Sequence, residues 1–344
     1  MFLLPEAQVY QVLTKLDHQQ CARLLDALTT ALVLYSSENN HRPSKPLLHQ
    51  PLRSSIVTSN GDTSLFMPSS DTTNNAIKII TLPSKGDTVG VNVLFAPSGQ
   101  ILGLVGASQV TAFRTALAAM CLFSKVTHIP KRHVVIFGSG KQVEWHIRLA
   151  LLLAGDEVER VTIINRGRQR LNQLEETVLS GLRLKYAKVQ FNTVAREDNL
   201  GYEDVLQAQL QSADAIFCCT PSTEPLFSFY PLQAAPKQRF ISVIGSYKPT
   251  MKEIDTATLL SGGGRIFVDS KEACLEESGE LIDAGITEDQ LIEMGEFFES
   301  KDAAYPDGNV VLKCVGMGIM DLVTSRILLE EAKRLGLGRD VEDF

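Results

Sequence analysis

The chain has 344 residues, more than a single hydrophobic core usually organises, so its length predicts two domains. Its composition, 44% hydrophobic and 21% charged, is that of an ordinary globular protein. The net charge of -7 argues against a nucleic-acid partner, because such a partner requires a basic face.

The six cysteines and six histidines show no CxxC motif and no metal-ligand spacing, so no metal site is expected. Cysteines without a disulfide framework are typical of a reducing compartment, which predicts a cytoplasmic protein. Residues 1–10 have no basic region and contain Pro5 and Glu6, so they make a poor secretory signal. The most apolar helix candidate, residues 149–154, is far too short to span a bilayer, and no membrane partner is expected.

The first third of the chain has the pattern of an α/β segment. Residues 21–35 show helical periodicity with one apolar face, and the polar, proline-bearing residues 36–50 predict a loop. A further helix is expected at 109–123, followed by a hinge at Thr127–Pro130. Short strands are predicted between these helices, at residues 55–58, 65–67, 77–81, 89–95 and 101–105.

Residues 133–166 have the order strand, glycine turn, helix and strand. Val134–Phe137 is a short apolar run typical of a strand buried on both faces, and Gly138-Ser139-Gly140 follows it directly. Gly138 permits a tight turn, and Gly140 lets the backbone approach a pyrophosphate. Val143 occupies the third position of the G-x-G-x-x-G/A fingerprint, where glycine or alanine is usual.

The helix predicted at 141–154 offers the amides of its first turn and its dipole to the phosphates of a ligand. Those amides belong to Lys141, Gln142 and Val143. A second strand at Val161–Ile164 completes the unit. A glycine pair alone is often only turn chemistry, but this order of elements predicts a dinucleotide-binding site.

The end of the second strand bears on which dinucleotide binds. Enzymes that use NAD commonly have Asp or Glu there for the ribose hydroxyls, whereas this strand ends in Asn165 and Arg166, followed by Arg168 and Arg170. Arginine suits a 2′-phosphate, and Asn165 can still hydrogen-bond the ribose. Ordinary surface charge at the start of a helix is the alternative explanation. NADP(H) is therefore favoured, and NAD(H) is possible.

Helices and strands continue to alternate beyond residue 166, which predicts an α/β fold with a Rossmann-type, doubly wound parallel sheet. Thr220, Pro221 and Ser222 follow a predicted strand at its carboxyl end, where cofactors bind in such sheets, so we expect them to line the nicotinamide side. A long helix at 317–335 is expected to return to the first domain. The predicted domains are residues 1–127, completed by 309–344, and residues 128–308.

Several motifs, in order along most of the chain, resemble those of the ornithine cyclodeaminase/mu-crystallin family. Val110–Ala116 (VTAFRTA) is similar to the family's T-x-x-R-T-A-A motif, and the Gly138 turn is a second match. Further matches are Thr220–Phe227, Ile244–Pro249 with Glu253 and Ile254, Val268–Ser270 and Val315–Asp321. The resemblance implies a homodimer whose substrate-binding and dimerisation domain is formed by 1–127 with 309–344, and a dinucleotide-binding domain at 128–308.

The resemblance also implies a carboxylate clamp of two arginines and a lysine, here Arg53, Lys78 and Arg114. Arginine orients a carboxylate through paired donors, and a desolvated lysine can also donate a proton, so Lys78 is the expected catalytic residue. The proton source is expected to be Lys78 or a bound water. Without the resemblance, Arg114 would more often be an ordinary ion-pair arginine. Lys78 interrupts an apolar strand and would be assigned to an edge or outward position.

One departure from the family pattern bears on the reaction. Ornithine cyclodeaminases carry G-G-D-C-P where this chain has Gly245–Pro249 (GSYKP), so Tyr247 stands at the position of the aspartate that assists deamination. A phenol that normally titrates near ~10 cannot simply replace a carboxylate base. The G-S-x-x-P form resembles the reductase and amino-acid dehydrogenase branch of the family, and mu-crystallin, which also favours NADP(H).

The favoured hypothesis is NAD(P)H-dependent reduction of the C=N bond of a small α-imino acid, cyclic forms included, as by a ketimine reductase, a pyrroline-2-carboxylate reductase or an amino-acid dehydrogenase. Two alternatives remain: a cyclodeaminase-type lyase that uses NAD catalytically, and a non-enzymatic protein that binds NADPH and a small ligand. Cys218 and Cys219 are expected in the core, and His146 is expected to be a packing or capping residue. Asp321 is interpreted as a helix cap.

Overall fold

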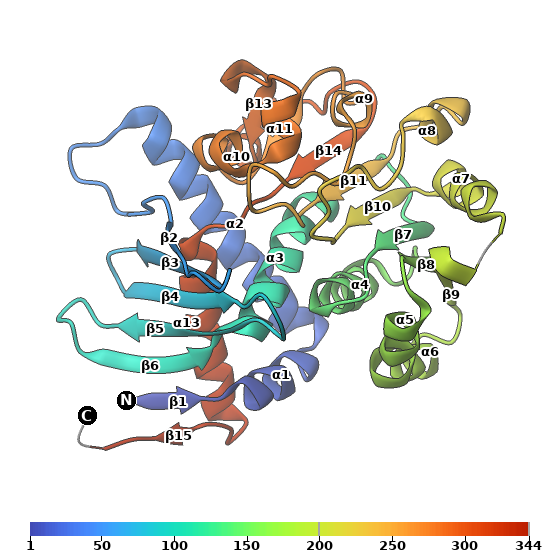
Figure 1. Cartoon of the computed structure of the whole chain (residues 1–344). Helices are drawn as coiled ribbons and strands as arrows, with labels where there is room; N and C mark the ends of the chain where they lie inside the picture. Colours follow the sequence, from blue (N-terminus) through green and yellow to red (C-terminus); the bar gives the residue numbers. More distant parts are fainter. Residues whose placement is uncertain (199, 343–344) are drawn as a thin grey trace. The chain divides into compact units, whose positions relative to one another are not determined.

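A computed structural model describes residues 1–198 and 200–342 of the chain (Figure 1). It divides into two compact units, unit 1 with Met1–Ala118 and Gly316–Phe344, and unit 2 with Ala119–Val315. Across the described residues, no helix combines the length and the apolar character that crossing a membrane requires.

Unit 1 is built on a seven-stranded mixed sheet, sheet A, in the order β15-β1-β6-β5-β4-β3-β2. Its strands are β1 (Phe2–Leu4), β2 (Ser54–Val57), β3 (Thr63–Ser70), β4 (Asn75–Leu82), β5 (Val89–Phe95), β6 (Ile101–Gly106) and β15 (Arg339–Asp340). Helix α13 (Gly318–Arg334) contacts five of these strands and covers one face of the sheet. The return helix predicted at 317–335 is therefore confirmed.

The other helices of unit 1 are α1 (Glu6–Thr14), α2 (His18–His41) and α3 (Ala107–Phe123), of which α3 ends in unit 2. The loop predicted from residue 36 is wrong for its first six positions, because α2 continues to His41 and ends at Arg42 in the left-handed conformation. Helix α2 begins earlier than its apolar pattern does, because Asp17 and Gln20 form a capping box at its start. Its buried face packs against α13.

Unit 2 contains an eight-stranded sheet, sheet B, in which every neighbouring pair is parallel. The order is β13-β12-β14-β11-β10-β7-β8-β9, so the direction of winding reverses between β7 and β10. This sheet confirms the predicted doubly wound fold. Its strands are β7 (His133–Phe137), β8 (Arg160–Asn165), β9 (Gln190–Ala195), β10 (Ala215–Cys218), β11 (Phe240–Val243), β12 (Ile266–Val268), β13 (Leu291–Glu293) and β14 (Val310–Lys313).

The α-helices of unit 2 are α4 (Lys141–Ala154), α5 (Arg168–Leu174), α6 (Ser180–Lys185), α7 (Tyr202–Ser212), α8 (Tyr230–Ala234), α9 (Thr256–Leu259), α10 (Lys271–Glu277), α11 (Gly279–Asp283) and α12 (Met294–Glu299). A π-helical turn, Glu175–Leu179, joins α5 to α6, and 3-10 turns lie at Arg196–Asp198 and Glu288–Gln290. The domain boundary predicted at 308/309 is wrong, because β14 pairs with β11 and β12 inside sheet B. The chain re-enters unit 1 only at Gly316.

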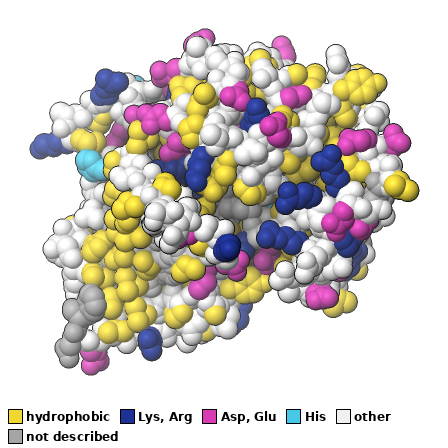
Figure 2. Space-filling model, viewed as in Figure 1, with side chains coloured by type: hydrophobic (Ala, Val, Ile, Leu, Met, Phe, Trp, Pro, Cys, Tyr) yellow, Lys and Arg dark blue, Asp and Glu magenta, His cyan; other side chains and the backbone are white. Residues whose placement is uncertain are grey.

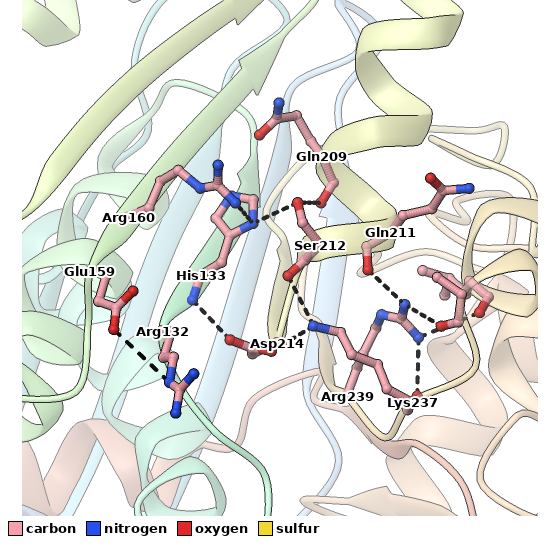
Figure 3. Close-up of polar contacts among 12 residues, drawn as sticks. Arg132, His133, Glu159, Arg160, Gln209, Gln211, Ser212, Asp214, Lys237 and Arg239 are labelled. Atoms are coloured by element: carbon pink, nitrogen blue, oxygen red, sulfur yellow. Dashed lines mark hydrogen bonds and ion pairs between the residues drawn. The ribbon is translucent and has the colours of Figure 1, made fainter.

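The amino ends of the sheet B strands carry a polar network (Figure 3). The side chain of Asp214 accepts hydrogen bonds from the His133 backbone N–H and from Lys237 Nζ. Arg239 lies 1% exposed and donates to the carbonyls of Gln211, Ala235 and Lys237. The carboxyl ends of the same strands, where ligands bind in open α/β sheets, are at the opposite edge.

Candidate functional site

Lys78 lies in β4, in the interior of sheet A, and not at the edge or outward position that the strand pattern alone suggests. Its cross-strand neighbours are Met67 and Asn92, all three side chains are buried, and Lys78 is 2% exposed. The face of the sheet that carries them is the face covered by α13, which contacts β4. A lysine in this position must be paired or lose its charge, because burial of an isolated ammonium is very costly.

Asp321, on the first turn of α13, supplies the partner. Its Oδ2 lies 2.7 Å from Lys78 Nζ and 3.3 Å from Nε of Arg114, which α3 contributes. Lys78, Arg114 and Asp321 are each at most 3% exposed. The interpretation of Asp321 as a helix cap is wrong: the N-cap of α13 is Met317, and the Asp321 carboxylate faces two of the predicted clamp residues.

Arg53, the third predicted clamp residue, precedes β2 and is half-buried. Its charge acts on Lys78: the pKa of Lys78 is lowered to about 7 by burial, then by the charge of Arg114 and, least, by that of Arg53, while Asp321 opposes the shift. The structure thus places Lys78 and Arg114 in contact with Asp321, and the charge of Arg53 acts on Lys78.

Gly316 and Asp321 show two further features of the cluster, one steric and one of hydrogen bonding. A Cβ on Gly316, which has φ +87°, would overlap the Arg114 guanidinium, so only glycine leaves room for that side chain. Asp321 Oδ1 is buried and accepts no hydrogen bond from any residue in the described part of the chain. A buried carboxylate oxygen without a donor is rare, and it suits a ligand that brings an N–H group.

The glycine turn of unit 2 has the geometry that a phosphate ligand needs. Gly138 has φ +116°, and a Cβ there would lie 3.0 Å from the Cys219 carbonyl and 3.2 Å from the Val143 side chain. Gly140 is the N-cap of α4 and has no capping side chain, and a Cβ on it would meet no atom within 4 Å. The amides of Lys141, Gln142 and Val143 follow in the first turn, so these residues fit a dinucleotide pyrophosphate.

At the end of β8, two carboxylates from a later part of the sequence lie close to Arg168. Asn165 donates to the Gly167 carbonyl 2.8 Å away, and Arg166 is exposed. Arg168 Nε lies 2.5 Å from Asp198, and the Arg168 backbone N–H donates to Glu197. Both acids follow β9, the neighbour of β8, so adjacent carboxyl ends bring together residues some 30 positions apart. Of the arginines in this segment, Arg168 therefore has its charge partly balanced.

The loop after β10 contains the remaining predicted cofactor residues. The Thr220 amide and hydroxyl both donate to Glu253, Pro221 is exposed, and Ser222 Oγ donates to the Glu224 carbonyl 2.6 Å away. Sequence patterns did not single out Glu253 as a functional residue, although it belongs to a motif matched to the family.

Cys218 and His146 have the structural roles predicted for them, whereas Cys219, also expected in the core, is only partly buried. Cys218 is fully buried in the core, and burial raises its thiol pKa well above the ordinary value, as it does for Cys219. His146 is fully buried and its Nδ1 donates to the Gln142 carbonyl, while burial lowers its pKa to about 4. None of the three has the charged form that a nucleophile or a general acid at neutral pH would need.

Comparison with known proteins places this geometry in a family. Residues 7–335 match the model of the ornithine cyclodeaminase/mu-crystallin family. A Delta(1)-pyrroline-2-carboxylate reductase of Bacillus thuringiensis subsp. konkukian is 26% identical over 311 residues, covering 85% of this chain and 89% of the relative.

Two solved structures share the fold over nearly the whole chain. The Thermococcus litoralis Delta(1)-pyrroline-2-carboxylate reductase in complex with NADH and L-proline has a TM-score of 0.81 at 20% identity, covering 99% of this chain and 100% of the other. An archaeal alanine dehydrogenase dimer with bound NAD has a TM-score of 0.79 at 15% identity, covering 100% and 99%. The family model spans all but the ends of the chain, which therefore belongs to the ornithine cyclodeaminase/mu-crystallin family.

Proposed function

We propose that this protein is an NAD(P)H-dependent oxidoreductase that reduces the C=N bond of a small α-imino acid to the amino acid. The observation that carries the proposal is the buried contact of Lys78 and Arg114 with the carboxylate of Asp321, with the charge of half-buried Arg53 acting on Lys78. The similar bacterial protein named Delta(1)-pyrroline-2-carboxylate reductase supports the same chemical class.

The charges of the cluster match those of a protonated α-imino acid. Such a substrate has a carboxylate and a positively charged iminium group on adjacent atoms. Arg53 and Arg114 would bind its carboxylate, since guanidinium groups offer paired donors at fixed spacing. Asp321 Oδ1, the buried acceptor without a donor, would take the iminium N–H. This arrangement orients the substrate and stabilises the protonated, reactive form.

Lys78 would deliver the proton that the substrate nitrogen requires. A general acid works best when its pKa lies near the operating pH, and that of Lys78 is lowered to about 7 by burial and by Arg114. An ordinary lysine would hold its proton too tightly to serve at neutral pH. Asp321 orients the Lys78 ammonium by direct hydrogen bonding, 2.7 Å away.

Unit 2 would hold the dinucleotide through Gly138, Ser139, Gly140 and the amides of Lys141, Gln142 and Val143, with Thr220, Pro221 and Ser222 on the nicotinamide side. A bound nicotinamide dinucleotide supplies the hydride. NADP(H) is our choice of cofactor, because Arg166 is exposed at the end of β8 beside Asn165 and Arg168, while Asp198 balances part of the charge of Arg168.

Tyr247 supports reduction over cyclodeamination, because the aspartate that assists deamination in cyclodeaminases is replaced here by a phenol. A cytoplasmic location is part of the proposal and is supported by six cysteines, none of which forms a disulfide among the described residues.

We also propose a homodimer formed through the outer face of sheet A. That face is apolar: rows of cross-strand neighbours run Phe66–Ile79–Val91 and Ile77–Val93–Leu104, and all six side chains are only half-buried. Figure 2 shows apolar side chains gathered over these strands. Contiguous apolar surface of this kind is typical of a protein interface, and the similar archaeal alanine dehydrogenase is a dimer.

The test of the function is an assay of the purified protein with a panel of cyclic and acyclic α-imino acids. NADPH or NADH consumption is followed by absorbance, and ammonia release from ornithine is measured separately. We expect NADPH oxidation with imino acids. Arg114→Met should lower kcat/KM by about 100-fold or more, because a bidentate charged contact to the carboxylate is lost. Ammonia release from ornithine without net NADPH oxidation would contradict the proposal and favour a lyase.

A further inference from the structure

Glu253 is a buried carboxylate at the carboxyl edge of sheet B to which the proposed chemistry gives no part. Its side chain is 0% exposed. Oε1 accepts hydrogen bonds from the Thr220 amide at 2.6 Å and the Thr220 hydroxyl at 2.9 Å, and Oε2 accepts one from the Gly245 amide at 2.7 Å. Thr220 follows β10 and Gly245 follows β11, so one carboxylate joins the loops that leave two neighbouring strands.

Backbone hydrogen bonds of residues 252 and 253 attach the loop Thr220–Leu226 at further points. The Lys252 amide donates to the Ser222 carbonyl at 2.9 Å, and the Leu226 amide donates to the Glu253 carbonyl at 2.8 Å. Residues 252 and 253 therefore contact the loop at its beginning, its middle and its end. A surface loop held at three points loses much of its conformational freedom before any ligand binds.

Gly245 makes the close approach possible. A Cβ at this position would overlap the Thr220 carbonyl and the Glu253 carboxyl group. Any other residue would push the two loops apart. The GSYKP segment therefore requires glycine at position 245 for a steric reason, independently of turn geometry.

Two further buried charged residues, Glu280 and Lys313, belong to a network that contacts the backbone of Glu253. The Glu253 amide donates to Glu280 Oε1 at 2.8 Å, and Glu280 also accepts hydrogen bonds from the hydroxyls of Ser246 and Ser278. Lys313, which is 0% exposed, contacts the Ser246 hydroxyl and its carbonyl and lies 3.6 Å from Glu280. Buried charges are costly and add little net stability compared with apolar packing, so this network is better explained by the conformation it imposes than by stability.

We propose that Glu253 is a positioning residue for the dinucleotide: it fixes the loop Thr220–Leu226 in the conformation in which that loop contacts the bound cofactor. The proposal rests on the dinucleotide site proposed above. Glu253 itself is buried behind the loop, so it would act through Thr220 and Gly245 and not by touching the ligand.

The protonation state of Glu253 should govern this attachment. All three of its side-chain partners donate to it, which matches the ionised carboxylate. A protonated carboxyl could donate only to the Thr220 hydroxyl, and it would accept more weakly from the Thr220 and Gly245 amides, which can only donate. Burial raises the pKa of Glu253 to about 7; Glu280 raises it too, while Lys313 and the backbone donors oppose the shift. The other titratable groups nearby, the thiols of Cys218 and Cys219, are kept neutral by burial. Protonation below about pH 7 should loosen the loop and weaken cofactor binding.

The experiment compares the wild-type protein with Glu253→Gln and, as a matched acid-to-amide control, Glu272→Gln, whose side chain is exposed on α10. Affinity for NADPH is measured by fluorescence titration between pH 6 and pH 9. Amide hydrogen exchange of residues 218–226 and 243–247 is measured without cofactor, so the order of the loop is read independently of the proposed activity. Steady-state assays separate KM for NADPH from KM for the imino acid.

For Glu253→Gln we expect roughly tenfold weaker NADPH binding at pH 8, a matching rise in KM for NADPH but not for the imino acid, and faster exchange in both loops. The wild type should lose affinity below about pH 7, as expected from the raised pKa of Glu253, and the variant should lose this pH dependence. A folded Glu253→Gln protein with wild-type affinity and pH profile overturns the proposal. If the wild type binds neither NADPH nor NADH while both loops remain protected, the proposed function fails instead.

If Glu253→Gln does not fold, hydrogen exchange of the wild-type protein alone tests the proposal. Loop protection, corrected for intrinsic exchange, should fall between pH 8 and pH 6 while peptides of β7 keep theirs. Equal pH dependence in the loops and in β7 overturns the proposal.

Discussion

The pair formed by Lys78 and Asp321 determines how much charge the clamp carries. Asp321 is the acidic side chain whose charge opposes the lowering of the Lys78 pKa. Replacing it with asparagine keeps the size of the side chain but removes the charge, so the pKa of Lys78 should fall below its present value of about 7.

Asp321→Asn should therefore lower kcat at pH 7 by about tenfold or more, since less Lys78 is protonated and the iminium loses its counter-ion. If protonated Lys78 is the acid, kcat falls as pH rises through the Lys78 pKa, and this decline should begin at lower pH in the variant. Stopped assays across a pH series measure the shift. Glu330→Gln, an exposed acid-to-amide change on the same helix, is the control and should match the wild type. An unshifted profile in Asp321→Asn would exclude Lys78 as the proton donor.

The residues of the clamp differ in how far the sequence could reveal them. Family motifs predicted Arg53, Lys78 and Arg114, but no local pattern shows that residue 321 lies over β4, since 243 positions separate Asp321 from Lys78. A physical argument was available nonetheless: Lys78 interrupts an apolar strand, and a lysine buried there requires an acidic partner from another element. That requirement predicts that a partner exists but cannot identify it.

At the scale of elements, Arg239 joins helices to the base of sheet B. Its guanidinium donates to Gln211 near the end of α7 and to Ala235 just after α8, where helix carbonyls lack intrahelical partners (Figure 3). The positive charge is also favourable at both helix C-termini because of their dipoles. One side chain thus satisfies orphan carbonyls of two helices next to the first residue of β11.

Arg239→Met should lower the free energy of unfolding by about 2–4 kcal/mol, because buried carbonyls lose their donor while the side-chain volume is largely kept. Urea unfolding followed by circular dichroism measures the change. Arg132→Met is the matched control: Arg132 is exposed and lies 3.9 Å from Glu159, so its loss should change stability by less than about 0.5 kcal/mol. Equal effects of the two substitutions would show that Arg239 contributes no more than a surface ion pair.

Elements that follow a periodic apolar pattern were predictable, and short or polar ones were not. The glycine-turn unit matches β7, α4 and β8 because it combines a buried strand with a helix of full length. Helix α7 was missed because it buries only Leu206 and Leu210, and three-residue β1 is held by pairing with β6 and β15 that no local pattern contains. The error at the second domain boundary has the same cause, since the pairing of β14 with β11 is non-local.

At the scale of the whole molecule, we propose that the outer face of sheet A is the surface through which two copies of the chain associate. Sheet A uses its inner face to pack against α13, and the opposite face still presents Ile79, Val91 and Val93 on its central strands. A second copy of the same face would bury these side chains, each contributing roughly 1–2 kcal/mol when fully covered. A symmetric dimer is the simplest closed assembly that does so.

Val93→Lys should therefore disrupt the dimer, because each protomer would bring one unpaired ammonium into an apolar interface. Light scattering after size exclusion should give twice the 37.8 kDa chain mass for the wild type and a single chain mass for the variant. Leu184→Lys is the control, since Leu184 is 86% exposed on α6 of unit 2 and should leave the dimer intact. A Val93→Lys protein that remains dimeric would place the interface elsewhere, and a wild type that is monomeric at micromolar concentration would leave the apolar face of sheet A to another partner.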